Sequence, residues 1–126
     1  MDKFEFARQM QRRTKKFAID IIRLTKKLPR NAEAFIFRKQ IMRSATSTAA
    51  NYRAACRSRT RREFIAKLGV VIEETDETMF WLELISDLSL LDKNTIEPVQ
   101  KEAGEILAIL LTSRQTAKDN NTPNKE

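Results

Sequence analysis

Apolar residues recur along this chain at alternating steps of four and three residues, the repeat of a helix that buries one side. The first such segment covers residues 4–28 and ends at Pro29, which has no backbone amide hydrogen to continue a helix. We therefore predict a first helix over residues 4–28 with a single apolar seam. The residues predicted to form this seam are Met10, Thr14, Phe17, Ile21, Leu24 and Leu28.

Two further segments show the same repeat. Asn31 is suited to cap a second helix, because its side chain accepts a hydrogen bond from a free amide of the first turn. Thr60 and Glu63 have the spacing of a capping box, in which each side chain accepts from the backbone amide of the other residue. We predict a second helix after Asn31 and a third from Thr60 to about Leu90. The seam residues are Phe37, Ile41, Ala45, Thr48, Tyr52 and Ala55 in the second helix and Phe64, Leu68, Val71, Thr75, Thr78, Leu82 and Ile85 in the third.

A fourth apolar segment begins near Thr95 and tolerates Pro98 in its first turn. Its predicted seam residues are Val99, Ala103, Ile106 and Leu110. Short connections between long helices favour antiparallel neighbours. The fold class we predict is therefore all-α, an antiparallel up-down-up-down four-helix bundle over residues 1–116, followed by a disordered polar tail at residues 117–126.

The third and fourth segments carry more apolar residues than the core of one bundle uses. Phe80 and Trp81 are adjacent on a helix, so their side chains point about 100° apart and cannot both face the seam. A generously filled core is one explanation, and self-assembly through these helices is the other. For self-assembly, the predicted oligomer interface consists of Ile72, Met79, Phe80, Trp81, Leu107 and Leu111.

Charge divides the chain into two halves. Residues 1–67 hold 19 Lys and Arg against 5 Asp and Glu, whereas residues 68–126 hold 5 against 12. A basic half of this density attracts a polyanion such as nucleic acid, or the acidic half of another copy.

The single cysteine excludes an internal disulfide and fits a reducing compartment. With no secretory signal and no apolar run long enough to span a bilayer, we expect a cytoplasmic, bacterial protein.

The basic residues fall into two stripes, opposite the seam of the first helix and along one outer face of the second, and continue into the turn that follows. Arginine predominates, and its guanidinium favours bidentate contact with phosphate. The candidate nucleic-acid-binding residues are Arg8, Arg12, Arg13, Lys16, Arg23, Lys39, Arg43, Arg53, Arg57, Arg59, Arg61 and Arg62. The sequence shows no base-reading arrangement, so binding is expected to be mainly through phosphates and tolerant of sequence.

An alternative explains the same stripes without nucleic acid. In that case the protein is an interaction scaffold, and its basic face is solvated or pairs with an acidic partner or with the acids of its own third helix. Those acids are Glu73, Glu74, Asp76, Glu77, Glu83 and Asp87.

Enzymatic chemistry has little support in the sequence. The absence of histidine excludes Ser-His-Asp and Cys-His nucleophile pairs and histidine-ligated zinc. Ser44, Ser47, Asn51 and Tyr52 are grouped on one helix, but no general base accompanies them, so we expect them to be structural. The arginines around Cys56 would lower the pKa of its thiol if it were exposed, yet without a partner it is expected to be inert. We predict no catalytic residue, no metal site and no cofactor.

Residues 38–55, which read RKQIMRSATSTAANYRAA, resemble the second-helix signature of the 23S ribosomal RNA intervening-sequence family, R-Q-I-x-R-S-x-x-S-x-x-x-N-Y-R-E-A. Residues 77–84, ETMFWLEL, resemble the third-helix pattern E-T-x-x-W-L-E-L, and the likeness extends over roughly residues 5–115. One difference is Ala54, which stands where the family usually has glutamate, so any role of that carboxylate does not transfer.

That family is similar to the accessory variability determinant protein of diversity-generating retroelements, a basic bundle that forms a pentameric barrel and binds nucleic acid and a reverse transcriptase. The resemblance therefore implies a four-helix bundle and a homopentamer. It also implies a retroelement-type accessory role beside a nucleic-acid enzyme such as a reverse transcriptase.

Overall fold

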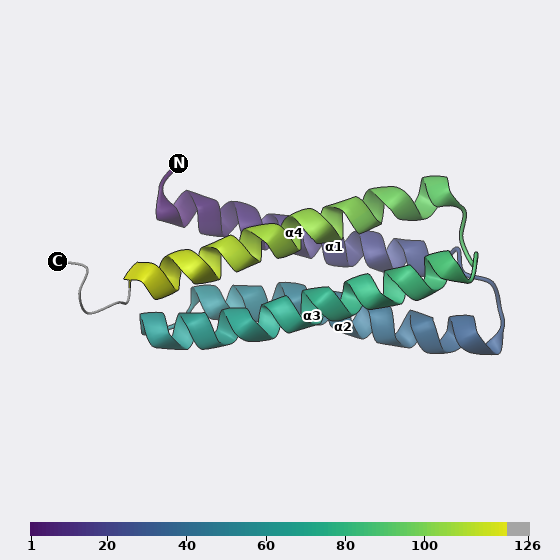
Figure 1. The fold of residues 1–126 in the computed structure, drawn as a ribbon, viewed down its shortest axis with the longest axis horizontal. Helices are drawn as coiled ribbons and strands as arrows, with labels where there is room; N and C mark the ends of the chain where they lie inside the picture. Colours follow the sequence, from purple (N-terminus) through teal and green to yellow (C-terminus); the bar gives the residue numbers. More distant parts are fainter. Residues whose placement is uncertain (121–126) are drawn as a thin grey trace.

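Residues 1–120 of the chain are described by a computed structural model, and they form four long helices. The helices are α1 (Lys3–Thr25), α2 (Ala32–Cys56), α3 (Arg61–Asp87) and α4 (Lys93–Asn120). Each helix runs antiparallel to the next, and the contacts of α4 with both α3 and α1 close the ring (Figure 1). The predicted all-α, up-down four-helix bundle is thus confirmed. None of the helices within residues 1–120 is long and apolar enough to cross a membrane.

The predicted seams form the core of the bundle. All seam residues named above are buried except Phe37, Phe64 and Val99, and these three pack against the core while partly exposed. Burial of each large apolar side chain contributes about 1.5–3 kcal/mol. The side-chain repeat of the sequence therefore accounts for most of the packing that holds the four helices together.

Two of the predicted helix starts have the expected caps. Asn31 Oδ1 accepts a hydrogen bond from the Ala34 amide at 2.9 Å, and Thr60 Oγ1 accepts from the Glu63 amide at 3.0 Å. The second half of the predicted capping box is wrong. The Glu63 carboxylate accepts instead from the amide of Arg59 at 3.4 Å and pairs with Lys67 one turn later at 2.9 Å.

The end of α3 and the start of α4 differ from the prediction. Helix α3 stops at Asp87 rather than near Leu90, because Ser89 has a φ of 53° and the Leu90 amide turns back to bond the Ile85 carbonyl at 3.0 Å. No glycine marks this left-handed position. Helix α4 begins at Lys93, so Pro98 lies in its second turn rather than its first.

The predicted boundary between bundle and tail is also displaced. Residues 117–120 continue α4, with Ala117 buried, so the prediction of a disordered tail is wrong for these four residues. The end of the helix is secured to the start of α3, where Arg61 Nη1 donates to the Asn120 carbonyl at 2.7 Å. The remainder of the predicted tail, residues 121–126, lies outside the described residues.

Candidate nucleic-acid interface

The outer face of α1 and α2 is where most of the predicted basic residues come together. Two contacts fix how these antiparallel helices lie against one another. Arg38 Nε of α2 donates to the Thr25 carbonyl of α1 at 3.3 Å, and near the other end the side chain of Gln11 is hydrogen-bonded to Cys56. This register places cations of the two helices at matching heights, namely Arg8 with Arg57, Arg12 with Arg53, and Lys26 with Lys39.

Arg13 belongs to a different surface. Its Nε and Nη2 donate to the two carboxylate oxygens of Glu102 on α4, each at 2.7 Å, and Nη2 also donates to Glu105 at 2.8 Å. The hydrogen bonds to Glu102 are the main reason why the pKa of this guanidinium rises further above its ordinary value. Since two carboxylates surround one cation, Arg13 adds no positive potential to the α1–α2 face.

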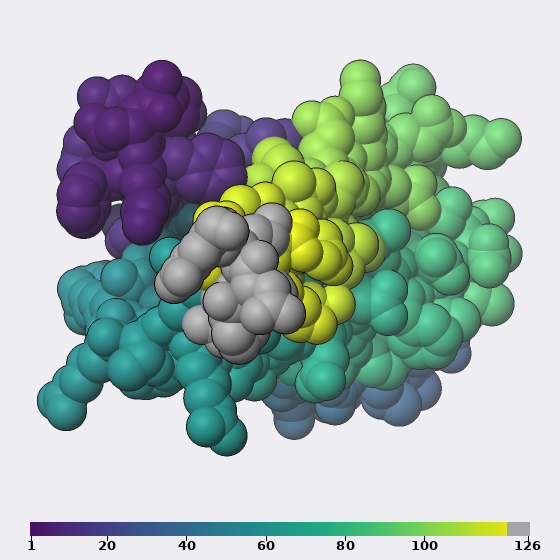
Figure 2. All heavy atoms as spheres, turned by 60° about the vertical axis from the view of Figure 1, so that its left-hand side comes forward, coloured from purple at the N-terminus to yellow at the C-terminus, as the bar shows by residue number. Residues whose placement is uncertain are grey.

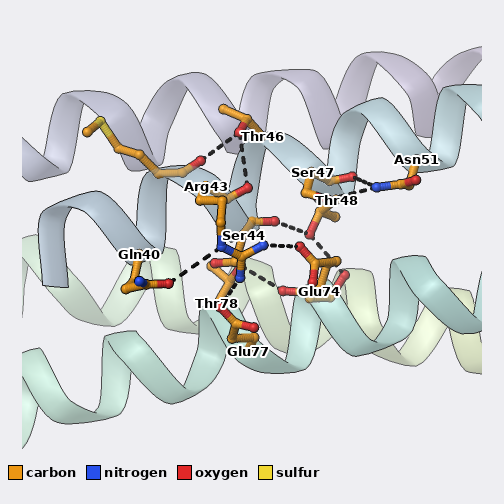
Figure 3. A network of polar contacts seen from close by, with 12 residues as sticks. Gln40, Arg43, Ser44, Thr46, Ser47, Thr48, Asn51, Glu74, Glu77 and Thr78 are labelled. Atoms are coloured by element: carbon orange, nitrogen blue, oxygen red, sulfur yellow. Dashed lines mark hydrogen bonds and ion pairs between the residues drawn. The ribbon is translucent and has the colours of Figure 1, made fainter. Parts of the chain in front are cut away.

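Arg43 is likewise held by acids of its own chain. Its Nη1 donates to Glu74 at 2.8 Å, and its Nη2 pairs with Glu77 (Figure 3). The Glu77 carboxylate also accepts from Trp81 Nε1 at 3.1 Å. These bonds, that of Trp81 first, lower the pKa of Glu77, while the pairing raises the pKa of Arg43. At this position the alternative interpretation, pairing with the acids of α3, describes the contact that forms.

Two more candidates have partners. Lys16 pairs with Asp20 one turn later at 2.7 Å, and Arg61 bonds the Asn120 carbonyl as described above. The other candidates are exposed and form no ion pair with any residue from 1 to 120. They are Arg8, Arg12, Arg23, Lys39, Arg53, Arg57, Arg59 and Arg62. We call this set the free cations.

The acids of the chain lie mainly on the opposite side. Glu73, Asp76, Glu83 and Asp87 are all exposed on α3. The bundle therefore separates a cationic α1–α2 face from an anionic α3 surface, and this separation follows from the order of the helices in the chain.

The hydroxyl residues between α2 and α3 are structural, as the sequence suggested. Thr48 Oγ1 donates to the Ser44 carbonyl at 2.9 Å, and Thr78 Oγ1 donates to Ser44 Oγ at 2.8 Å across the helix pair (Figure 3). Asn51 Nδ2 donates to the Ser47 carbonyl at 2.8 Å. These hydroxyl and amide groups donate to one another and to the helix backbone.

Cys56 does not have the lowered pKa that exposure among arginines would produce. The thiol is half-buried, and burial raises its pKa, against a smaller opposite effect of hydrogen bonds from Tyr52 and Gln11. Burial also raises the pKa of Tyr52. The cysteine is therefore a protonated thiol packed between α1 and α2.

The residues predicted for an oligomer interface divide into two groups. Ile72, Met79 and Trp81 pack against the core of their own bundle, so a filled core accounts for half of the apolar surplus. Phe80 remains 49% exposed beside Trp81, with ring centroids 5.2 Å apart. Leu111 is exposed as well, and Leu107 is half-buried.

Sequence reasoning missed a cleft at the end of the bundle where both α1 begins and α4 ends. Its lining comes from all four helices, so no continuous motif marks it. The one available signal was Phe4 and Phe6, two aromatic residues that precede the seam and do not belong to it.

The fold and its surface define an all-α bundle of four antiparallel helices, with cations on the α1–α2 face that form no ion pair within residues 1–120. Residues 4–112 match the model of the 23S rRNA-intervening sequence protein family, and the chain belongs to this family. It is similar to the crystal structure of a Bacteroides thetaiotaomicron protein of the S23 ribosomal protein family, described as having unknown function. The two are 32% identical with a TM-score of 0.77, over 83% of this chain and 97% of the other. A search of curated proteins gave no match.

Proposed function

We propose that this protein is a non-enzymatic, oligomeric basic bundle that binds nucleic acid, RNA or DNA, mainly through phosphates. Its role would be that of an accessory to a nucleic-acid enzyme such as a reverse transcriptase. The observation that supports binding most directly is the set of free cations, six of which lie on α1, on α2 or directly after it, while Arg59 and Arg62 follow in the turn and on α3. These side chains have no acid to neutralise them within residues 1–120, although the bundle carries acids elsewhere.

The layout of the free cations suits a polyanion. From Arg8 to Arg23 the stripe on α1 extends over about 22 Å at a helix rise of 1.5 Å per residue. The register with α2 adds a second row beside it, at Arg57, Arg53 and Lys39. Two parallel rows of this length can contact several phosphates at once, and each contact releases counterions from the nucleic acid.

A titration with RNA and with DNA at several salt concentrations tests the proposal. Affinity should fall steeply with salt, because log K decreases by about 0.9 per phosphate contact for each unit of log salt. A lack of measurable binding even at low salt would contradict the proposal.

The face itself is tested by reversing two free cations at one height, Arg12→Glu with Arg53→Glu. Affinity should drop about tenfold or more at ~0.1 M salt, since two phosphate contacts become repulsions. Lys93→Glu with Lys101→Glu is the matched control, because both lysines are exposed on α4 and the change in net charge is equal. Equal losses in the two double variants would show that net charge alone matters.

The second candidate function is a protein-interaction scaffold that does not bind nucleic acid. Arg13 and Arg43 favour it, because both already pair with carboxylates of this chain. An acidic partner would form ion pairs of the same kind between its carboxylates and the free cations. Binding of an acidic protein with no affinity for RNA or DNA would support the scaffold instead.

The oligomeric part of the proposal rests on the family resemblance, which implies five subunits, and on the exposed Phe80 and Leu111. Packed aromatic residues at interfaces often cost ~2 kcal/mol or more when truncated. Light scattering should therefore give a mass several times 14.7 kDa. A mass near that of one chain over a wide concentration range would contradict the oligomer.

A further inference from the structure

The cleft at the open end of the bundle has a volume of about 840 Å³. The first residues of α1, the turn between α2 and α3, and the last turns of α4 surround it. Figure 2 views this end of the molecule, with the start of α1 in purple, the α2–α3 turn in teal and the end of α4 in yellow. A volume of this size lies within the range of ~300–1,000 Å³ that is typical of ligand sites.

The cleft is open because α1 and α4 make the least extensive helix contact of the bundle. Figure 1 shows these two helices crossing, so that they separate toward the ends that carry the termini. Arg13, with Glu102 and Glu105, joins the two helices, and no ion pair joins them nearer the start of α1 within the described residues. On the α4 side the wall consists of Ile109 and several smaller residues, among them Ala108, Thr112 and Thr116.

The lining combines aromatic side chains with cations. Phe4 is 72% exposed and Phe6 38% exposed, although both line the cleft. Arg59 lies at the rim, carries no ion pair with residues 1–120 and is one of the free cations. Ser58 Oγ, also at the cleft, is buried and has no hydrogen-bond partner among residues 1–120. A buried hydroxyl of this kind would gain a bond from a polar ligand.

We propose that this cleft receives unpaired bases of a single-stranded nucleic acid, so that the protein binds single strands more tightly than duplexes. The proposal rests on the proposed function and names its substrate more closely. Every base has a π face that can stack on Phe4 or Phe6, and stacking of this kind tolerates any sequence. The bases of a duplex are already stacked on their neighbours and cannot enter without unpairing.

The position of the cleft supports this occupant over an apolar peptide. Arg8 and Arg57, which lie at one height on the α1–α2 face, are the free cations nearest this end of that face, and the rim adds Arg59. A strand whose phosphates follow the α1–α2 face therefore reaches the cleft without a gap in positive charge. Its base can stack on one of these phenyl rings while its backbone stays on the cations.

The test compares an unpaired 20-nucleotide RNA with a 20-base-pair RNA duplex at one salt concentration. Wild-type protein should bind the single strand several-fold more tightly. The double variant Phe4→Ala/Phe6→Ala should lose about tenfold in affinity for the single strand, within the range that alanine substitution of stacking residues produces, and less than twofold for the duplex. Phe4→Tyr/Phe6→Tyr keeps both rings and should bind as the wild type does.

Phe35→Ala is the matched control. Phe35 is 56% exposed on α2, where its ring lies 5.4 Å from Lys39 Nζ and beside Arg30 and Arg38, away from the cleft. This variant should lose less than twofold in affinity, and equally for both RNAs, because it removes no ring from the cleft. Circular dichroism and light scattering on each variant check that fold and mass are unchanged.

Four results would overturn the inference. Equal affinity of the wild type for strand and duplex would do so, as would an alanine double variant that binds both as the wild type does. In either case the proposed function stands if Arg12→Glu/Arg53→Glu still weakens binding about tenfold or more. A changed mass in the alanine variant with an unchanged strand preference would mean that the cleft receives a second copy of the chain. Absence of all RNA binding would overturn both proposals.

Discussion

Two helix contacts in this bundle are built from opposite kinds of residue. The α2–α3 contact is the most extensive of the four, and small side chains such as Ser44, Thr48 and Thr78 lie in it. The α1–α4 contact is the least extensive, and its polar link is Arg13 with Glu102 and Glu105. The same apolar repeat runs through all four helices, so the repeat does not explain the difference.

The two contacts differ in extent because different residues flank the seam positions. Small hydroxyl side chains allow α2 and α3 to approach, and they satisfy their polar atoms within the pair, as Thr78 does with Ser44. An arginine with two glutamates needs more space and keeps part of its charge in water. We call α2–α3 the closed contact and α1–α4 the open contact, and the open contact leaves room for the cleft.

The largest effect is expected from filling the closed contact. Ser44 is fully buried on α2 and its hydroxyl accepts from Thr78 of α3, so Ser44→Leu forces a larger side chain into this contact. Overpacking of this kind costs about 1–3 kcal/mol. Urea denaturation should show a lower midpoint with an unchanged slope. Ala50→Leu on the exposed side of the same helix is the control, and it should change the free energy of unfolding by less than ~0.5 kcal/mol. Equal shifts would contradict a tightly packed α2–α3 contact.

A smaller effect is expected at the open contact, where neighbours in the sequence serve different surfaces. Arg13→Gln should lower stability by about 1 kcal/mol, because it removes a partly exposed pair and leaves two carboxylates together. Arg12→Gln, at an exposed position, should change stability by less than ~0.5 kcal/mol.

For nucleic-acid binding, Arg12→Gln should have a larger effect than Arg13→Gln. Arg12→Gln should weaken affinity and reduce the salt slope by about one, as expected for loss of one phosphate contact. Arg13→Gln should leave the slope unchanged, because its charge is already neutralised by Glu102 and Glu105. Identical slopes in the two variants would contradict the division into free and paired cations.

The smallest effect concerns pH. The pKa of Glu77 is lowered in the folded chain, first by the hydrogen bond from Trp81 and then by Arg43. The stabilisation from this carboxylate is therefore complete above its unfolded pKa of ~4.3 and is lost as pH falls through the lower, folded pKa. Glu77→Gln should cost about 0.5 kcal/mol at pH 7 and less at acid pH. Denaturation midpoints at pH 7 and pH 3 measure this, with the exposed Glu73→Gln as control. A cost that does not decrease on acidification would contradict the assignment.

Much of the fold could be predicted because its causes are local. The spacing from Met10 to Leu28 reports which side of α1 is buried, and Asn31 and Thr60 cap helices with side chains that reach only three residues ahead. The end of α3 could not be predicted in the same way. Ser89 adopts a left-handed conformation without being glycine, and the turn-back bond from Leu90 to Ile85 accompanies it.

The sequence by itself determined the four helices, their buried sides and the division of charge between the two halves, because each depends on neighbours within a few turns. Tertiary structure decided which charges remain available. Arg12 and Arg13 are identical and adjacent, yet only Arg13 meets Glu102, which lies on α4 at the far end of the chain. It also decided the cleft, because Phe4, Ser58 and Arg59 are brought together only by the divergence of α1 from α4. The distances between residues of different helices are set by how the helices pack, and no repeat within one helix encodes them.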